Sequence, residues 1–212
     1  MNRYQDRQQA GKLLATYLTH YTNQPQTLVL ALPRGGVPVG YEIAMALNLP
    51  LDIFIVRKLG VPQHDELAMG AMASGGMTVF NQDIVKTFSI SSEDIQNVIQ
   101  KETQEMQRRE KAYRGNRAFP DIAGKTLILV DDGIATGATL RAAIHALRTL
   151  KPEAIIVAIP IAEKTSYDAL TTLVDKIICP LIPTDFSSVG SGYNVFPQVS
   201  DEEVSRLLSY AL

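Results

Sequence analysis

The chain has 212 residues, enough for one substantial domain, and we expect a single domain over residues 1–212. Hydrophobic residues make up 46% and charged residues 20%, which excludes a disordered or fibrous protein. The formal net charge of −2 provides no overall positive field, so neither DNA nor a membrane surface is expected as a partner. The single cysteine excludes a disulfide framework, and with the polar N-terminal sequence it favours a cytoplasmic location.

Short apolar runs alternate along the chain with amphipathic segments. The predicted strands are 27–32, 51–56, 77–80, 127–131, 154–159 and 176–181, and the predicted helices are 37–47, 93–113, 138–150 and 164–173. This alternation predicts an α/β fold with a central, mostly parallel sheet flanked by helices. Ligands of such sheets bind beyond the carboxyl ends of the strands. Segments 59–76 and 183–198 fit no regular element, and loops of that length in a compact domain are usually functional.

The most informative segment follows the predicted strand at 127–131. Two adjacent carboxylates, Asp131 and Asp132, lead into a loop of small residues that opens a helix. The loop residues are Ala135, Thr136, Gly137, Ala138 and Thr139. Exposed backbone N–H groups, two hydroxyls and a helix N-terminus together form a phosphate cradle. The carboxylates can accept hydrogen bonds from vicinal hydroxyls or help to hold a hydrated Mg²⁺. The sequence therefore predicts a ligand with both a phosphate and a diol, a ribose 5-phosphate.

This segment resembles the phosphoribosyl pyrophosphate motif of type I phosphoribosyltransferases, which has four apolar residues, two acids and a Thr-Gly-x-Thr loop. The resemblance implies the type I phosphoribosyltransferase fold, with a small hood and a mobile lid loop. It also implies a Mg²⁺-dependent enzyme that transfers ribose 5-phosphate from phosphoribosyl pyrophosphate to a nitrogenous base and releases pyrophosphate. Asp131 and Asp132 would hold the ribose hydroxyls and, indirectly, the metal, while residues 135–139 would anchor the 5-phosphate.

Two further segments resemble loops of the same family, in the family's order. Pro33-Arg34-Gly35-Gly36 is similar to the pyrophosphate loop, in which Arg34 is a cation and Gly35 and Gly36 present backbone N–H groups. Arg57-Lys58 is similar to the pair that opens the lid of adenine- and orotate-type enzymes. The resemblance makes 59–76 the lid and Arg34, Arg57 and Lys58 the catalytic cations that neutralise the departing pyrophosphate. His64 and Glu66 are candidates for proton transfer or positioning.

The acceptor is left open by the sequence. The segments 108–115 and 186–204 resemble a bacterial group described only as predicted phosphoribosyltransferases, with no assigned acceptor. Family enzymes for 6-oxopurines carry Asp where this chain has Ala135, which argues against hypoxanthine or guanine. A C-terminal hood over about 183–199 matches neither the adenine nor the uracil type. Its aromatic residues Phe186, Tyr193 and Phe196 could stack on a planar base or pack the C-terminal cap.

The expected partners are therefore phosphoribosyl pyrophosphate and a nucleobase-like acceptor, with a homodimer left open. The alternative function is a regulator that binds phosphoribosyl pyrophosphate or a nucleotide without turnover. The roughly 25 residues before the first strand are too few for a helix-turn-helix domain. Basic residues gather in the stretch 101–117, but glutamates interleave with them, which is typical of a solvated helix face with ion pairs one turn apart.

Overall fold

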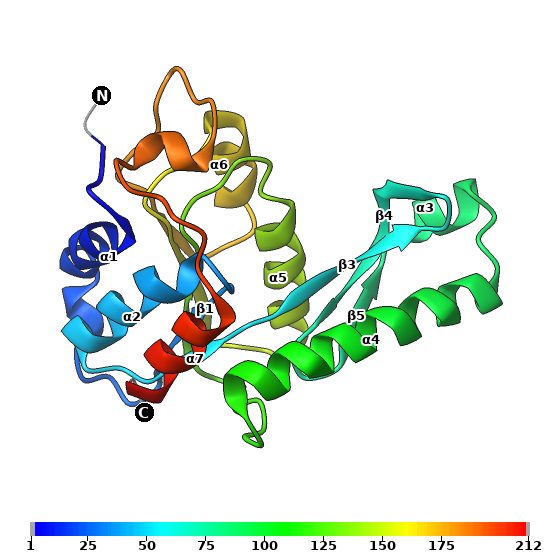
Figure 1. Ribbon diagram of the computed structural model, residues 1–212, viewed down its shortest axis with the longest axis horizontal. Helices are drawn as coiled ribbons and strands as arrows, with labels where there is room; N and C mark the ends of the chain where they lie inside the picture. The colour runs from blue at the N-terminus through cyan, green and yellow to red at the C-terminus, as the bar shows by residue number, and fades with distance from the viewer. Residues whose placement is uncertain (1–2, 211–212) are drawn as a thin grey trace.

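The computed structural model describes residues 3–210, apart from the side chains of Asp65 and Glu66. It has a body and an arm that projects from it (Figure 1). The body is built on a five-stranded parallel sheet with the order β2-β1-β6-β7-β8. These strands are β1 (Thr27–Ala31), β2 (Leu51–Ile53), β6 (Thr126–Val130), β7 (Ala154–Ala158) and β8 (Lys176–Ile178). The parallel sheet confirms the α/β fold that the apolar runs predict.

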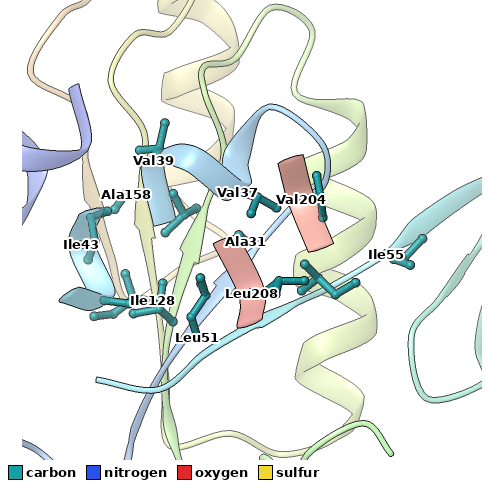
Figure 2. Close-up of a cluster of buried hydrophobic side chains, with 14 of the residues drawn as sticks. Ala31, Val37, Val39, Ile43, Leu51, Ile55, Ile128, Ala158, Val204 and Leu208 are labelled. Atoms are coloured by element: carbon teal, nitrogen blue, oxygen red, sulfur yellow. The ribbon is translucent and has the colours of Figure 1, made fainter. Parts of the chain in front are cut away.

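Helices cover both faces of the parallel sheet. One face carries α1 (Arg7–Thr16), α2 (Gly36–Leu47) and α7 (Asp201–Tyr210), and the other carries α5 (Ala138–Thr149) and α6 (Lys164–Thr171). Successive residues of a strand point to opposite faces, so Ala31 packs toward α2 and α7 whereas Leu30 packs toward α5. Figure 2 shows the first of these clusters, in which Val204 and Leu208 of α7 close over the sheet. Two short 3-10 helices complete the body, at Thr19–Tyr21 and Val189–Gly192.

The arm is a second, antiparallel sheet backed by a long helix. Its strands are β3 (Val56–Val61), β4 (His64–Ala73) and β5 (Met77–Phe80), followed by α3 (Gln82–Thr87) and α4 (Ser92–Arg114). In Figure 1, α4 runs along the sheet and α3 lies at the far end of the arm. The expectation that 59–76 is a loop is wrong. These residues form most of a β-hairpin, because Leu59 and Met69 are buried in the same apolar cluster as Met106 of α4.

The long helix α4 has the features that its sequence predicts. Ser91 caps it by accepting a hydrogen bond from the backbone N–H of Asp94. On its exposed side, Glu105 accepts hydrogen bonds from Arg108 at 2.8 Å and from Arg109 at 2.7 Å. These two guanidinium groups lower the pKa of the Glu105 carboxyl to about 2, and the hydrogen bond from Arg108 has the larger effect. Glu105 is therefore paired on the helix itself, and here the interpretation as a solvated helix face holds. It does not hold for Glu102, which pairs with Arg57 of β3, or for Arg114, which is buried against Asp52.

A buried arginine joins the arm to the body. Arg114, the last residue of α4, donates from Nε to Asp52 Oδ1 at 3.0 Å and from Nη2 to the carbonyl of Ile53 at 2.7 Å. Its guanidinium carbon lies 5.3 Å from the ring centroid of Phe119. Because both partners at β2 belong to the sheet of the body, this contact fixes where the arm leaves it. Within residues 3–210, no helix combines the length and the apolar character needed to cross a membrane.

Candidate functional site

Two loops meet beyond the carboxyl ends of β1 and β6, the place expected for a ligand of this sheet. The backbone N–H of Leu32 donates to the carbonyl of Val130 at 2.8 Å, so the loop after β1 starts against the end of β6. A Cβ atom at Gly36 would lie 2.7 Å from that carbonyl oxygen. A Cβ atom at Gly35 would overlap the carboxylate of Asp132. Both glycines are therefore required by the close approach of the two loops.

The loop between β6 and α5 is held in shape by a glycine turn and by side chains that bind its carbonyls. Gly137 has φ +70°, in the left-handed region, and turns the chain into α5. Ser166 of α6 donates to the carbonyl of Ala135 at 2.6 Å, and Arg141 donates to the carbonyl of Thr136 at 2.8 Å. With its carbonyls engaged in this way, the loop can direct its N–H groups and the N-terminus of α5 toward a ligand.

A small cavity lies at this loop. It has a volume of about 190 Å³, and its lining consists of Asp131 and residues 133–140. Thr136 and Thr139 are exposed, so their hydroxyls are accessible. The structure thus brings the loop residues of the predicted phosphate cradle together with the first carboxylate of the acidic pair.

The two carboxylates of the acidic pair have different surroundings. Asp131 Oδ1 accepts the backbone N–H of Asp132 at 2.8 Å. Burial, together with the neighbouring charge of Asp132, raises the pKa of Asp131 well above its usual value. Asp132 Oδ2 instead meets the guanidinium of Arg7, with Nε at 2.9 Å and Nη2 at 2.8 Å. Burial also raises the pKa of Asp132, and Arg7 opposes that rise.

Arg7 is the site residue that the sequence analysis missed. No motif surrounds it, and 125 positions separate it from Asp132. The one available signal was Asp6, whose side chain caps α1 by accepting from the backbone N–H of Gln9 at 2.8 Å. That cap could have revealed a helix starting at Arg7, although not its contact with the acidic pair.

The hood aromatics pack against the acidic pair and one another. The Tyr193 side chain donates from its hydroxyl to the backbone carbonyl of Asp132 at 2.5 Å, and the residue is 3% exposed. Its ring stacks on Phe196 with a centroid distance of 4.8 Å, and the Phe196 ring also lies 3.8 Å from the guanidinium carbon of Arg7. Phe186 packs against the small cluster that contains Tyr193. Tyr193 is buried in the C-terminal cap, so a base could reach its ring only after a rearrangement, whereas Phe196 is 36% exposed. Stacking of a base on these rings stays a prediction.

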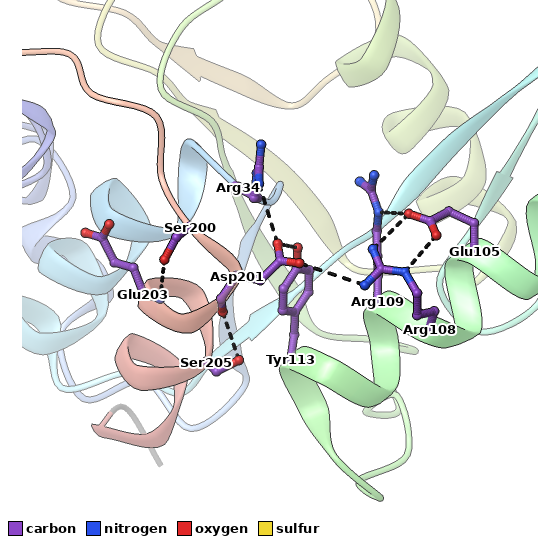
Figure 3. Close-up of polar contacts among 9 residues, drawn as sticks. All are labelled: Arg34, Glu105, Arg108, Arg109, Tyr113, Ser200, Asp201, Glu203 and Ser205. Atoms are coloured by element: carbon purple, nitrogen blue, oxygen red, sulfur yellow. Dashed lines mark hydrogen bonds and ion pairs between the residues drawn. The ribbon is translucent and has the colours of Figure 1, made fainter.

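The three predicted cations are not gathered at the cavity. Arg34 Nη1 lies 3.7 Å from Asp201 Oδ1 at the start of α7, a carboxylate that also accepts the Tyr113 hydroxyl (Figure 3). Arg57 faces α4, where its Nη2 lies 2.6 Å from Glu102 Oε2.

Lys58, one residue further along β3, points to the opposite side of the arm sheet from Arg57. There it lines a cavity of about 160 Å³ together with Ala138 and Thr139. Of the three cations, Lys58 is thus the one that shares a cavity with the phosphate loop. The ring of His64 lies 5.6 Å from Phe88, at the end of the arm that carries α3, and the side chain of Glu66 lies outside the described residues.

Comparison with known proteins identifies the class to which this fold and site belong. The Phosphoribosyl transferase domain profile matches residues 2–194, so the chain belongs to that family. A Mycobacterium tuberculosis protein named provisionally as a phosphoribosyl transferase is 39% identical over 211 residues. The alignment covers 100% of this chain and 47% of that protein, so the chain spans about half the length of the curated relatives that it matches.

Solved structures show the same fold. A crystal structure from Thermus thermophilus is 33% identical, has a TM-score of 0.85 and covers 97% of each chain. A second, from Aquifex aeolicus, is 11% identical with a TM-score of 0.51, covering 87% of this chain and 78% of the other. The first match extends over the body and the arm alike, whereas the second supports the fold alone.

Proposed function

We propose that this chain is a Mg²⁺-dependent phosphoribosyltransferase that moves ribose 5-phosphate from phosphoribosyl pyrophosphate to a nitrogenous base. The observation that carries the proposal is the cavity shared by Asp131 and the loop 133–140, beside the glycines of the loop after β1. A phosphate cradle next to a carboxylate fits a ligand with a phosphate at one end and a diol in the middle. The single domain, the homodimer and the cytoplasmic location stay predictions.

The donor would lie across the two loops. Residues 135–139 would hold its 5-phosphate with backbone N–H groups and the Thr136 and Thr139 hydroxyls, and Asp131 and Asp132 would accept the ribose hydroxyls. The loop 33–36 would bind the pyrophosphate through its N–H groups. Pyrophosphate carries most of the donor's charge, so a cation must reach it from outside this loop. We assign this role to Lys58, which lines a cavity with Ala138 and Thr139 of the neighbouring phosphate loop.

The acidic pair fits a magnesium ion that is shared with the donor. Among the described residues, no three His, Cys, Asp or Glu side chains gather as a metal cage. Mg²⁺ commonly takes one or two carboxylates and completes its shell with water and phosphate oxygens, which suits Asp131 and Asp132. When bound, the ion would neutralise charge on the donor.

The reaction would break the bond between C1 of the ribose and pyrophosphate while the nitrogen of the acceptor attacks from the opposite face. The chain's own contribution is to position the ribose and to stabilise the charge that grows on the leaving group. Arg34 and Arg57 are paired with Asp201 and Glu102, so each would have to exchange a carboxylate for pyrophosphate to take part. The acceptor class stays open, and Ala135 argues against a 6-oxopurine.

A regulator that binds the same ligands without turnover is the second candidate. The observation that favours it is the internal pairing of Arg34 and Arg57, which removes two of the three expected cations from the leaving group. Binding of a sugar phosphate would need only the cradle and the acidic pair.

Pyrophosphate release from phosphoribosyl pyrophosphate and Mg²⁺ is the test, measured with a panel of nucleobases. The enzyme proposal predicts release with at least one acceptor. Lys58→Gln should lower turnover about a hundredfold, the typical effect of losing one donor to developing charge. Arg57→Gln is the matched control, since it removes a neighbouring cation that faces α4, and its effect should be smaller. Tight donor binding with no release for any acceptor would instead support the regulator.

A further inference from the structure

Arg7 links the acidic pair to the C-terminal hood through a closed set of contacts. Its guanidinium binds Asp132 Oδ2 through Nε and Nη2, and Nη1 donates to the carbonyl of Pro197 at 2.8 Å. The same group lies over the ring of Phe196, which stacks on Tyr193, and the Tyr193 hydroxyl returns to the carbonyl of Asp132. The Arg7 side chain is only 10% exposed, so the guanidinium itself has little access to water.

The start of α1 is held in place without Arg7. The backbone N–H of Tyr4 donates to the carbonyl of Gly192, and the N–H of Asn194 donates back to the carbonyl of Tyr4, both at 2.8 Å. The Tyr4 hydroxyl donates to the carbonyl of Pro160. Further along α1, Gly11 packs against the backbone of Val39 in α2. These contacts fix the helix to the body, so the guanidinium of Arg7 is not needed to dock α1.

The charge balance at the acidic pair depends on Arg7. Two adjacent ionised carboxylates would carry −2 next to a donor that is itself a polyanion, and Arg7 reduces this to −1. Both nitrogens of the guanidinium meet the same oxygen, Oδ2, and the backbone of Gly35 packs against the carboxylate from the other loop. The carboxylate of Asp132 is thereby fixed in orientation. With Oδ2 engaged by Arg7, Oδ1 is the oxygen left for a ribose hydroxyl, on a side chain that is 15% exposed.

We propose that Arg7 is a positioning residue that orients Asp132 for recognition of the ribose 2-hydroxyl and couples this recognition to the hood. The proposal rests on the proposed function, because it concerns the same sugar phosphate. Arg7 acts through Asp132 and does not touch the ligand. The bidentate contact needs the planar guanidinium, so lysine at this position would keep the charge but lose the fixed geometry.

The test is the ratio of affinities for ribose 5-phosphate and 2-deoxyribose 5-phosphate, measured by titration calorimetry at constant Mg²⁺. Wild-type protein should prefer ribose 5-phosphate by at least about tenfold, the lower end of the value of one hydrogen bond to a charged group. Arg7→Gln should bring the ratio close to one, and Arg7→Lys should give an intermediate ratio. Lys12→Gln is the matched control, since it removes a cation from the exposed side of the same helix and should leave the ratio unchanged.

An unchanged ratio in Arg7→Gln, or an equal fall in Lys12→Gln, would overturn the proposal. Should Arg7→Gln fail to fold, the folded Arg7→Lys variant decides in the same way, because an unchanged ratio there excludes the orienting role. Wild-type protein that binds both sugar phosphates equally would contradict the role of Arg7 but leave the phosphate cradle standing. Wild-type protein that binds neither would contradict the proposed function itself.

Discussion

Replacing Asp201 with asparagine should raise the affinity of the chain for pyrophosphate. The carboxylate of Asp201 lies at the start of α7, 3.7 Å from Arg34 Nη1, and accepts a hydrogen bond from the Tyr113 hydroxyl (Figure 3). Asparagine keeps an oxygen for the Tyr113 hydroxyl but lacks the charge that attracts Arg34. Arg34 could then turn toward pyrophosphate without breaking an ion pair.

The magnitude follows from the distance and the exposure of the pair. Two unit charges at this separation attract by about 1 kcal/mol with the dielectric constant of water and by about 4 kcal/mol with an effective value near 20. The side chains of Arg34 and Asp201 are 37% and 35% exposed, so the lower figure applies. Measured exposed ion pairs contribute about 0–1 kcal/mol, which predicts a gain of up to about fivefold in pyrophosphate affinity.

Titration calorimetry with inorganic pyrophosphate and Mg²⁺ measures this gain. Glu202→Gln is the control, because it removes a carboxylate from the same helical turn and any loss of helix stabilisation is shared. The gain should be absent when Asp201→Asn is combined with Arg34→Gln. A gain that persists in this double variant, or an equal gain in Glu202→Gln, would refute the reasoning that Asp201 restrains Arg34.

Thr139→Ala should weaken ribose 5-phosphate binding by about 1.5–3 kcal/mol but leave phosphate-free ribose unaffected, as calorimetry with both sugars would show. Burial raises the pKa of the Cys179 thiol to about 12, so iodoacetamide at pH 8 should label it only after unfolding, and rapid labelling of folded protein would contradict this. Arg114→Met should lower the free energy of unfolding, measured by urea denaturation, by about 3–5 kcal/mol, because Asp52 stays buried without its partner. Asp52→Asn should restore part of that loss, and a simple sum of the two effects would argue against the pairing.

The body of the molecule could be predicted because its elements are local in sequence. The strands β1, β6 and β7 are buried on both faces, so each appears as an uninterrupted apolar run. The phosphate loop could be predicted equally well from the sequence, since all its residues lie within one short segment. Its cavity confirms only that these residues come together, and their ligand stays a prediction.

The arm could be predicted only in part. Strand β5 and helix α4 match the predicted strand 77–80 and helix 93–113, whereas the hairpin of β3 and β4 was missed because its order comes from contacts across the chain. The strand β4 contains glycine and small residues, and a bulge near Gly60 interrupts the alternation that would mark a hairpin. Helix α1 was missed for a similar reason: only half of its sequence is apolar, and its packing depends on Gly11 meeting the backbone of α2.

The partners of the predicted cations lie far away in sequence. Arg57 meets Glu102 after 45 positions, and Arg34 meets Asp201 at the other end of the chain. Motif reasoning assigns such residues to the site, but it gives no direction to their side chains. The structure supplies these directions, and with them the different roles proposed for Arg57 and Lys58.

The central claim is that the loop after β6 and the acidic pair bind phosphoribosyl pyrophosphate. Titration calorimetry of the folded chain with this donor and Mg²⁺ tests it most directly. The account predicts saturable one-site binding that ribose 5-phosphate displaces and that Thr139→Ala weakens. Absence of binding by folded wild-type protein, or binding that Thr139→Ala leaves unchanged, would contradict it.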